Sequence, residues 1–188
     1  LKAARAMATH FSYSNRLDEL HACVVKDNQG NSISQPQIRF AIDLNGTRIA
    51  AQHGLLYSAL RLNRSVKVYV AQSSPSWALA DTQWQSLSEI ESVLDITKAM
   101  STLSQSEAIF LGAYGPVLKA MTLARLRGEE MSVVNLASVN GAQTIPTRKQ
   151  VAEVELSETG RTALNRARLE AERRWCGNLS DVVANDST

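Results

Sequence analysis

The chain has 188 residues, of which 44% are apolar and 5% aromatic, with only nine glycines and four prolines. This composition favours a helical domain with a buried core and excludes a collagen-like repeat, a disulfide scaffold and a mostly disordered chain. The net charge of +2 does not by itself indicate nucleic-acid binding. Cys23 and Cys176 stand far apart and outside any zinc or redox motif, and we interpret both as free thiols.

The first part of the chain predicts helices. Apolar side chains at helical spacing predict a helix over residues 2–26, in which Ser14 can cap a second helix after an interruption. Residues 27–32 are rich in turn-forming types and predict a loop. Residues 38–44 alternate apolar and polar side chains, which fits either a short strand or a loop that enters the core. A long helix with a threonine N-cap is predicted over residues 47–71.

The middle of the chain predicts two more helices. The first is capped by Asp81 or Thr82, and its helical stripe of apolar side chains runs on past Leu103. The second covers residues 109–127 and has Val117 and Ala120 on its apolar stripe. We expect Pro116 either at the first position of a new helix or at a kink.

The last part of the chain predicts an interruption and then a final helix. Residues 129–156 are expected to be a loop or linker, because an Asn-Gly turn and Pro146 break any helix. Residues 158–175 again show a helical stripe. Together the elements predict an all-α, antiparallel arrangement of about five or six helices. We divide the chain into a helical domain (1–128), this linker, and a C-terminal helix with a polar tail (157–188).

The sequence shows no membrane or export signal. No run of about 18 apolar residues predicts a transmembrane helix. No basic and then apolar N-terminus suggests a signal peptide. Because the first residue is Leu1 and not methionine, we expect a processed chain or a piece of a longer protein.

Charged side chains are distributed unevenly along the sequence. Residues 39–67 carry five basic side chains and one acidic one, whereas residues 81–107 carry five acidic side chains and one basic one. Residues 161–174 carry five arginines and two glutamates. This polarity fits solvated helix faces, a basic surface for nucleic acid, or an attraction between protein partners.

Few side chains stand in patterns that carry catalysis. The scattered glycines form no phosphate-binding loop, and the three histidines lack the spacing of zinc ligands. His53 lies off the apolar stripe, so we expect it to be partly exposed or locally bonded. Glu89 and Glu91 are two positions apart on a helix and therefore point to different sides. We assign no catalytic residue and no metal ligand.

Two stretches resemble the middle of the hAT superfamily of DNA transposases. That family has an aspartate, a Thr-Arg-Trp motif at the start of a helix, and then a second helix with a tryptophan near its start. Residues 43–70 read DLNGTRIAAQHGLLYSALRLNRSVKVYV, and residues 80–107 read ADTQWQSLSEIESVLDITKAMSTLSQSE. Residues 4–20, ARAMATHFSYSNRLDEL, are also similar, so the resemblance covers about residues 3–125.

The resemblance implies an RNase H-like enzyme with three catalytic acids that bind divalent metal. A large all-α domain is inserted between the second and third acid, and this chain would be mostly that insertion. We therefore expect no complete catalytic site and no cofactor in this fragment, with divalent metal only in the full-length parent. The expected partner is DNA, and a homo-oligomer is open. We expect a nuclear location, with no membrane and no small-molecule substrate.

The resemblance also implies DNA-contacting residues. Ile49 stands where the family has tryptophan, and Asp43 lies further from the Thr-Arg pair than usual, which indicates a divergent or degenerate copy. Basic side chains that follow the pair can hold phosphates by charge-assisted hydrogen bonds. The expected nucleic-acid-binding residues are Thr47, Arg48, Arg61, Arg64 and Lys67.

Other interpretations remain beside this one. Arg48 can instead pair with Asp43 or cover a solvated helix start. The charge polarity also fits a non-enzymatic helical protein-interaction module. Residues 139–144, VNGAQT, look like a segment of abortive-infection phage-resistance proteins, and we interpret them as an Asn-Gly turn.

Overall fold

The computed structural model describes residues 1–31, 40–41, 49–104, 111–137 and 146–175. These residues are mostly helical and include one small two-stranded sheet, which confirms the predicted all-α fold class. The elements in chain order are α1 (Lys2–His10), α2 (Ser14–Asn31), α3 (Ile49–Arg61), α4 (Asn63–Ser73), α5 (Asp81–Ser104), α6 (Leu111–Arg127), β1 (Glu130–Val134), β2 (Arg148–Ala152), the short 3-10 helix η2 (Glu153–Glu155) and α7 (Glu158–Trp175).

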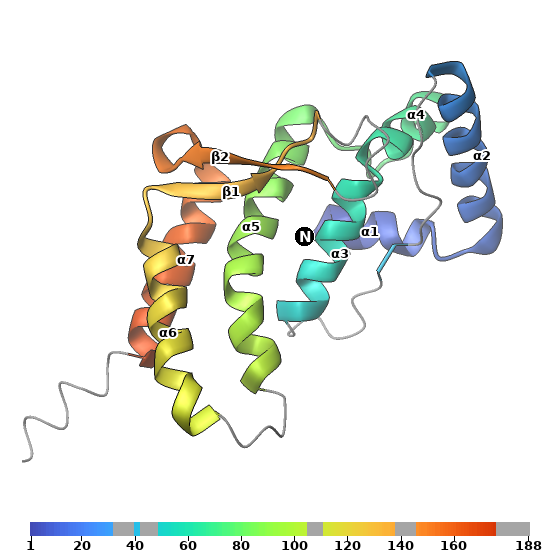
Figure 1. Cartoon of the computed structure of the whole chain (residues 1–188). Helices are drawn as coiled ribbons and strands as arrows, with labels where there is room; N and C mark the ends of the chain where they lie inside the picture. Colours follow the sequence, from blue (N-terminus) through green and yellow to red (C-terminus); the bar gives the residue numbers. More distant parts are fainter. Residues whose placement is uncertain (32–39, 42–48, 105–110, 138–145, 176–188) are drawn as a thin grey trace, which may run out of the picture.

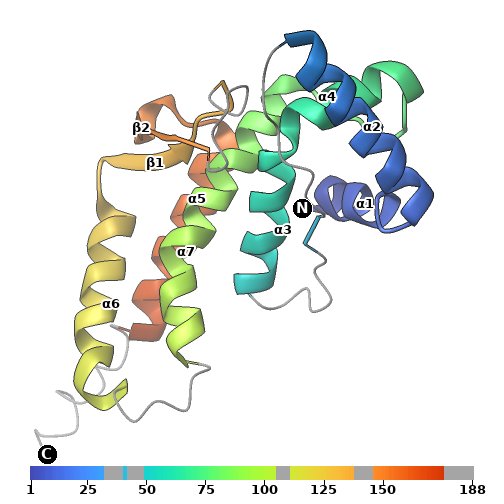
Figure 2. The ribbon, with the colours of Figure 1, turned by 45° about the vertical axis from the view of Figure 1, so that its right-hand side comes forward.

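The helices form two groups at the ends of an elongated molecule (Figure 1). One group contains α1, α2, α3 and α4, and the other contains α5, α6, α7 and the two strands. Helices α3 and α5 lie side by side and join the two groups (Figure 2). The molecule therefore has two hydrophobic core clusters, and α5 contributes to both.

The first core cluster lies between α1, α3, α4 and the start of α5. Met7, Leu56, Leu60 and Trp84 are wholly or almost wholly buried there. Burial of an apolar side chain of this size contributes about 2 kcal/mol. Because Trp84 lies in the first turn of α5, its burial holds the start of α5 against the first group.

The second core cluster lies between α5, α6, α7 and the strands. Val93 of α5, Leu126 of α6, Met131 of β1 and Leu164 of α7 are at most 5% exposed. Helix α7 begins and ends where the sequence predicts, at residues 158 and 175. Its apolar stripe packs on α5 and α6 and closes this end of the molecule.

The strands correct the prediction of a loop or linker over residues 129–156. β1 and β2 pair antiparallel, with Met131 opposite Val151 and Val133 opposite Lys149. Met131, Val133 and Val151 are buried in the second core cluster, whereas Lys149 is exposed. An isolated pair of five-residue strands is marginally stable, so packing against α5 decides this structure.

Two helix boundaries also differ from the prediction. The loop predicted at residues 27–32 was wrong for residues 27–31, because α2 continues to Asn31. The long helix predicted over residues 47–71 is broken at Leu62 into α3 and α4. Leu62, the residue between α3 and α4, is wholly buried in the core. Helix α4 ends at Ser73, after which Ser74 takes a left-handed conformation with φ 44°.

Phe40 and Ala41 are the described part of the stretch that predicts either a strand or a loop. Neither residue belongs to a helix or strand, and Phe40 is 7% exposed. Its ring stacks on Phe11 with the centroids 5.3 Å apart. These two residues therefore agree with a loop that enters the core, and the other residues of 38–44 lie outside the described ranges.

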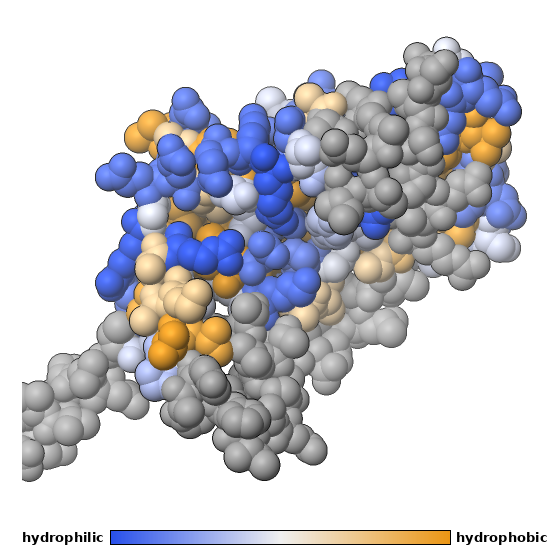
Figure 3. Space-filling view, viewed as in Figure 1, coloured by the Kyte–Doolittle hydropathy of each residue, from blue (hydrophilic) through white to orange (hydrophobic). Residues whose placement is uncertain are grey.

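Helix α6 turns a different face to the core than its sequence predicts. Val117 is 54% exposed and Met121 is 58% exposed, whereas Thr122 and Leu126 are buried. An apolar patch is visible over α6 on an otherwise largely hydrophilic end of the molecule (Figure 3). Pro116 is the sixth residue of α6 and does not lie at the start of a separate helix.

Candidate functional site

The structure describes three of the five residues expected to contact DNA. Thr47 and Arg48 lie outside the described residues, as does Asp43. Arg61 is the last residue of α3, and Arg64 and Lys67 lie three positions apart on α4. The three basic side chains therefore lie at the end of α3 and in the first turns of α4.

Arg64 is engaged in holding the fold together. Its Nε and Nη2 atoms donate to the two carboxylate oxygens of Asp27 on α2, at 2.5 and 3.0 Å. The Asp27 side chain is only 8% exposed, and this hydrogen bonding raises the pKa of Arg64. Bidentate pairs of this kind are the strong ones. Arg64 thus ties α4 to α2.

Lys67 and Arg61 are less tightly held. Lys67 Nζ lies 2.6 Å from Oδ1 of Asp81, but both side chains are exposed, at 44% and 86%. An exposed pair of this kind contributes less than about 1 kcal/mol, so a phosphate can compete for Lys67. The Nε atom of Arg61 is buried and makes no hydrogen bond to any residue that the structure describes.

A cluster of four ionisable side chains joins the two helix groups. His53 comes from α3, Glu91 and Asp95 from α5, and Arg148 from β2. His53 Nε2 lies 3.0 Å from Oε1 of Glu91 and 3.3 Å from Oδ1 of Asp95. Arg148 Nη2 donates to the same Glu91 oxygen at 2.6 Å and lies 3.9 Å from Oδ2 of Asp95. The two carboxylates are thus shared between an imidazole and a guanidinium.

Burial and neighbouring charges act in opposite directions on this cluster. Burial of the His53 ring opposes its protonation, yet the adjacent Asp95 and Glu91 carboxylates raise the pKa of His53 above its usual value. Contact with His53 lowers the pKa of Asp95, with Arg148 adding to the effect. Each shift favours the charged form, so the geometry suits an ion-pair network. A protonated imidazole has no lone pair with which to act as a general base.

The cluster also has the donor set of a cation site. One nitrogen of His53 and one oxygen each of Glu91 and Asp95 lie within 4.8 Å of one another. However, Arg148 donates to Oε1 of Glu91 and lies 3.9 Å from Oδ2 of Asp95, so its positive charge competes with a cation for these carboxylates. A divalent ion therefore does not fit beside Arg148 as the side chains stand.

Glu89 is a second buried carboxylate, and it binds residues at the start of α7. It accepts hydrogen bonds from the backbone N–H and the hydroxyl of Ser157, and from Gln85 Nε2 at 3.0 Å. Ser157 Oγ in turn accepts from the N–H of Gly160 at 3.1 Å, as an N-cap of α7 does. Glu89 and Glu91 therefore serve opposite sides of α5, which confirms the prediction that they do not form a pair.

The sequence reasoning missed the four-residue cluster. His53 is 5% exposed, and its partners lie on another helix, so the expectation of a partly exposed or locally bonded ring was wrong. One signal was available: Glu91 and Asp95 are four positions apart and share a face of one helix. Two like charges on one helix face favour a nearby cation, but nothing in the sequence identifies Arg148 as that cation.

Comparisons with known protein families, curated proteins and solved structures found no match to this chain. Within the described residues, no helix has both the length and the apolar character to cross a membrane. Function is therefore inferred from the residues of this chain and from their arrangement.

Proposed function

We propose that this chain is part of an hAT-like DNA transposase, or of a protein derived from one. In this role it contributes DNA binding and scaffolding and holds no complete catalytic site. The proposal rests on the sequence resemblance, and one structural observation supports it. The two stretches that carry the resemblance fold into α3 and α5, which pack directly against each other.

Details of these two helices agree with such a domain. Helix α3 begins at Ile49, directly after the Thr-Arg pair. Helix α5 begins at Asp81 and buries Trp84 in its first turn, at 1% exposure. An inserted domain of an RNase H-like enzyme would be all-α, and the nuclear location and the divalent metal of the parent enzyme belong to the same proposal. A homo-oligomer is a further part of it.

The bonding of three acids of α5 supports a non-catalytic role. Glu89 is bound to the start of α7, and Glu91 and Asp95 are bound to His53 and Arg148. Acids that hold a catalytic metal need open coordination positions. These carboxylates stabilise helix packing instead.

The proposed DNA contact runs from Thr47 and Arg48, just before α3, to Arg61 and Lys67. Arg61 has an unused buried Nε, and Lys67 has only an exposed partner. Neither side chain is held by a buried ion pair among the described residues, so a contact with phosphate would break none. Arg64 is set apart in this proposal, because its substitution would leave the Asp27 carboxylate buried without its partner.

The test is binding to a fluorescein-labelled DNA duplex of about 30 base pairs, followed by anisotropy over a series of salt concentrations. We expect affinity to fall as salt rises, and the double variant Arg61→Ala, Lys67→Ala to lower the salt slope by about 2. Lys119→Ala is the matched control, since Lys119 is exposed on α6 in the other helix group. Affinity that is independent of salt, or equal in the double variant and the control, would contradict the proposed DNA contact.

A further inference from the structure

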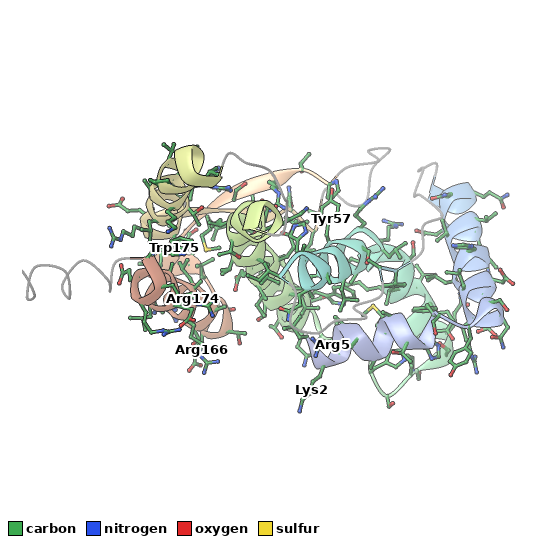
Figure 4. The ribbon with its side chains drawn as sticks, turned by 90° about the horizontal axis from the view of Figure 1, so that it is seen from below. Lys2, Arg5, Tyr57, Arg166, Arg174 and Trp175 are labelled. Atoms are coloured by element: carbon green, nitrogen blue, oxygen red, sulfur yellow. The ribbon has the colours of Figure 1, made fainter. Side chains whose placement is uncertain are left out.

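Helix α6 is apolar on two opposite faces. One face packs on α5 and α7, where Leu126 is buried and Leu123 is partly buried in the second core cluster. The other face carries Val117 and Met121, which are 54% and 58% exposed. Seen from below, α6 (yellow) lies at one edge of the second helix group and Arg166 of α7 at the opposite edge (Figure 4). A helix that is apolar all round is normally covered on all sides, so this exposed face lacks a partner among the described residues.

The exposed face of α6 consists of two rows with four-residue spacing. Val117 and Met121 form a row of large side chains. The neighbouring row has smaller side chains and contains Pro116, Ala120 and Ala124, all of them exposed. Rows with this spacing are the ridges and grooves by which helices pack against one another. The exposed face therefore presents a ridge directly beside a groove.

These two rows are complementary to a second copy of themselves. In an antiparallel pair of α6 helices with a two-fold axis between Ala120 and Met121, Val117 lies opposite Ala124 of the other copy. Met121 then lies opposite Ala120 of the other copy. Each large side chain meets an alanine on both sides of the axis. An interface between identical chains about a two-fold axis requires this kind of self-complementary surface.

The charges beside the face do not oppose such a pair. Arg127 donates to Glu172 at 2.8 Å, and Arg125 lies 4.0 Å from Asp95, so each arginine has an acid of its own chain nearby. In the antiparallel pair Arg125 lies opposite Pro116 of the other copy and not opposite a second arginine. A face whose neighbouring arginines are paired in this way has little charge with which to attract an acidic peptide or a phosphate backbone.

We propose that the exposed face of α6 is the contact between two copies of this chain, which pack there as an antiparallel helix pair. The inference rests on the homo-oligomer included in the proposed function, and it names the surface that forms it. From Pro116 to Ala124 the face spans about 12 Å of helix. So short a contact buries less than the roughly 800 Å² per partner of a stable interface, so we expect a weak dimer with a Kd of about 100 µM.

Sedimentation equilibrium of the full chain, at concentrations from about 10 to 500 µM, measures the self-association. We expect Met121→Glu to weaken the dimer at least about 10-fold, because it places a carboxylate in an apolar contact. Lys119→Glu is the matched control and should leave the dimer unchanged, since Lys119 is exposed on α6 but lies outside both rows. A chain that stays monomeric over this range, or a dimer that Met121→Glu leaves unchanged, overturns the proposal.

A mixture of two variants tests the antiparallel register. Val117→Glu and Ala124→Lys should each weaken the dimer of their own chain, and circular dichroism checks that both variants fold. In the mixture the introduced carboxylate lies opposite the introduced ammonium, so we expect the mixed dimer to be at least about 10-fold tighter than either variant alone. In a parallel pair the two groups would lie about 10 Å apart along the helices. A mixture that gains nothing overturns the antiparallel contact.

DNA binding distinguishes this inference from the DNA contact proposed above. Met121→Glu should leave the salt-dependent affinity for the DNA duplex unchanged, because that contact lies near α3 and α4 in the other helix group. A chain that binds DNA but stays monomeric overturns only the α6 contact, whereas a dimer without DNA affinity overturns only the DNA contact. DNA affinity that falls in Met121→Glu would mean that this face binds nucleic acid, which also overturns the proposal.

Discussion

Arg148 on β2 places its Nη2 atom 2.6 Å from Oε1 of Glu91 on α5, whose side chain has no exposed surface. The two residues stand 57 positions apart in the sequence. Arg148 also donates from Nη1 to the carbonyl of Ser132 on the neighbouring strand, at 2.9 Å. One guanidinium therefore joins the strand pair to the helix that both core clusters share.

We expect Arg148→Ala to lower the free energy of unfolding by about 3 kcal/mol, because it leaves the Glu91 carboxylate buried without this partner. Urea unfolding followed by circular dichroism measures the loss. Lys149→Ala, on the same strand but exposed, should cost less than about 0.5 kcal/mol. Equal costs for the two variants would show that the Arg148–Glu91 pair does not hold the strands.

The stability of the fold should fall as pH rises past neutrality. The pKa of His53 is raised in the folded chain, so its protonated form contributes stability below its unfolded value of about 6.5. That contribution is lost as pH rises through the native pKa. We expect the free energy of unfolding to decrease above about pH 6.5, by at most about 1.4 kcal/mol per pH unit from this group.

The variant His53→Gln tests this assignment. Urea titrations at a series of pH values should show a flatter profile above about pH 6.5 for the variant than for the unmodified chain. Asp95 affects stability at acidic pH. Its pKa is lowered in the folded chain, so its charged form contributes stability above about pH 4. That contribution is lost as pH falls through the native pKa of Asp95. A variant profile that keeps the same alkaline slope would assign that slope to another group.

Zinc should not stabilise the unmodified chain, because the Arg148 guanidinium already binds Oε1 of Glu91 and its positive charge opposes an ion beside His53, Glu91 and Asp95. In Arg148→Ala the three ligand atoms lose that competitor, so added Zn²⁺ should raise the melting temperature by a few degrees, and EDTA should reverse the rise. Thermal unfolding with and without the metal measures both. An equal rise in the unmodified chain would mean that the guanidinium does not exclude the ion.

Gly160→Ala should destabilise the fold, although alanine is normally the better helix former by about 1 kcal/mol. A Cβ atom at this position would collide with Oε2 of Glu89, whose carboxylate is held by Ser157. We expect a loss of about 2 kcal/mol in urea unfolding, since the carboxylate must leave its hydrogen bonds.

Two comparisons make the Gly160 prediction specific. Gly30→Ala on α2 meets open space and should be neutral or slightly stabilising. In a Glu89→Ala background, Gly160→Ala should lose most of its cost, because the colliding carboxylate is gone. If Gly160→Ala costs as much free energy of unfolding in that background as in the unmodified chain, the Glu89 carboxylate is not the group that the Cβ atom meets.

The sequence by itself determined the helical class and several helix ends. Apolar spacing along residues 158–175 is enough to place α7, because a stripe with helical period needs no distant partner to be recognised. It also determined that Glu89 and Glu91 face different sides of α5, since helix geometry sets this locally. The DNA-binding interpretation comes from the sequence as well, through a resemblance that the packing of α3 against α5 supports.

Only the tertiary structure decided the strand pair, the burial of His53 and the exposure of Val117. β1 and β2 are too short to be read from alternation, and they persist because Met131 and Val151 fill a space against α5 and α7. His53 and Arg148 became partners of Glu91 and Asp95 through packing between distant segments, which no local pattern records. The arrangement of neighbours around each helix decides which face is buried and which charges meet, and that arrangement exists only once the chain is folded.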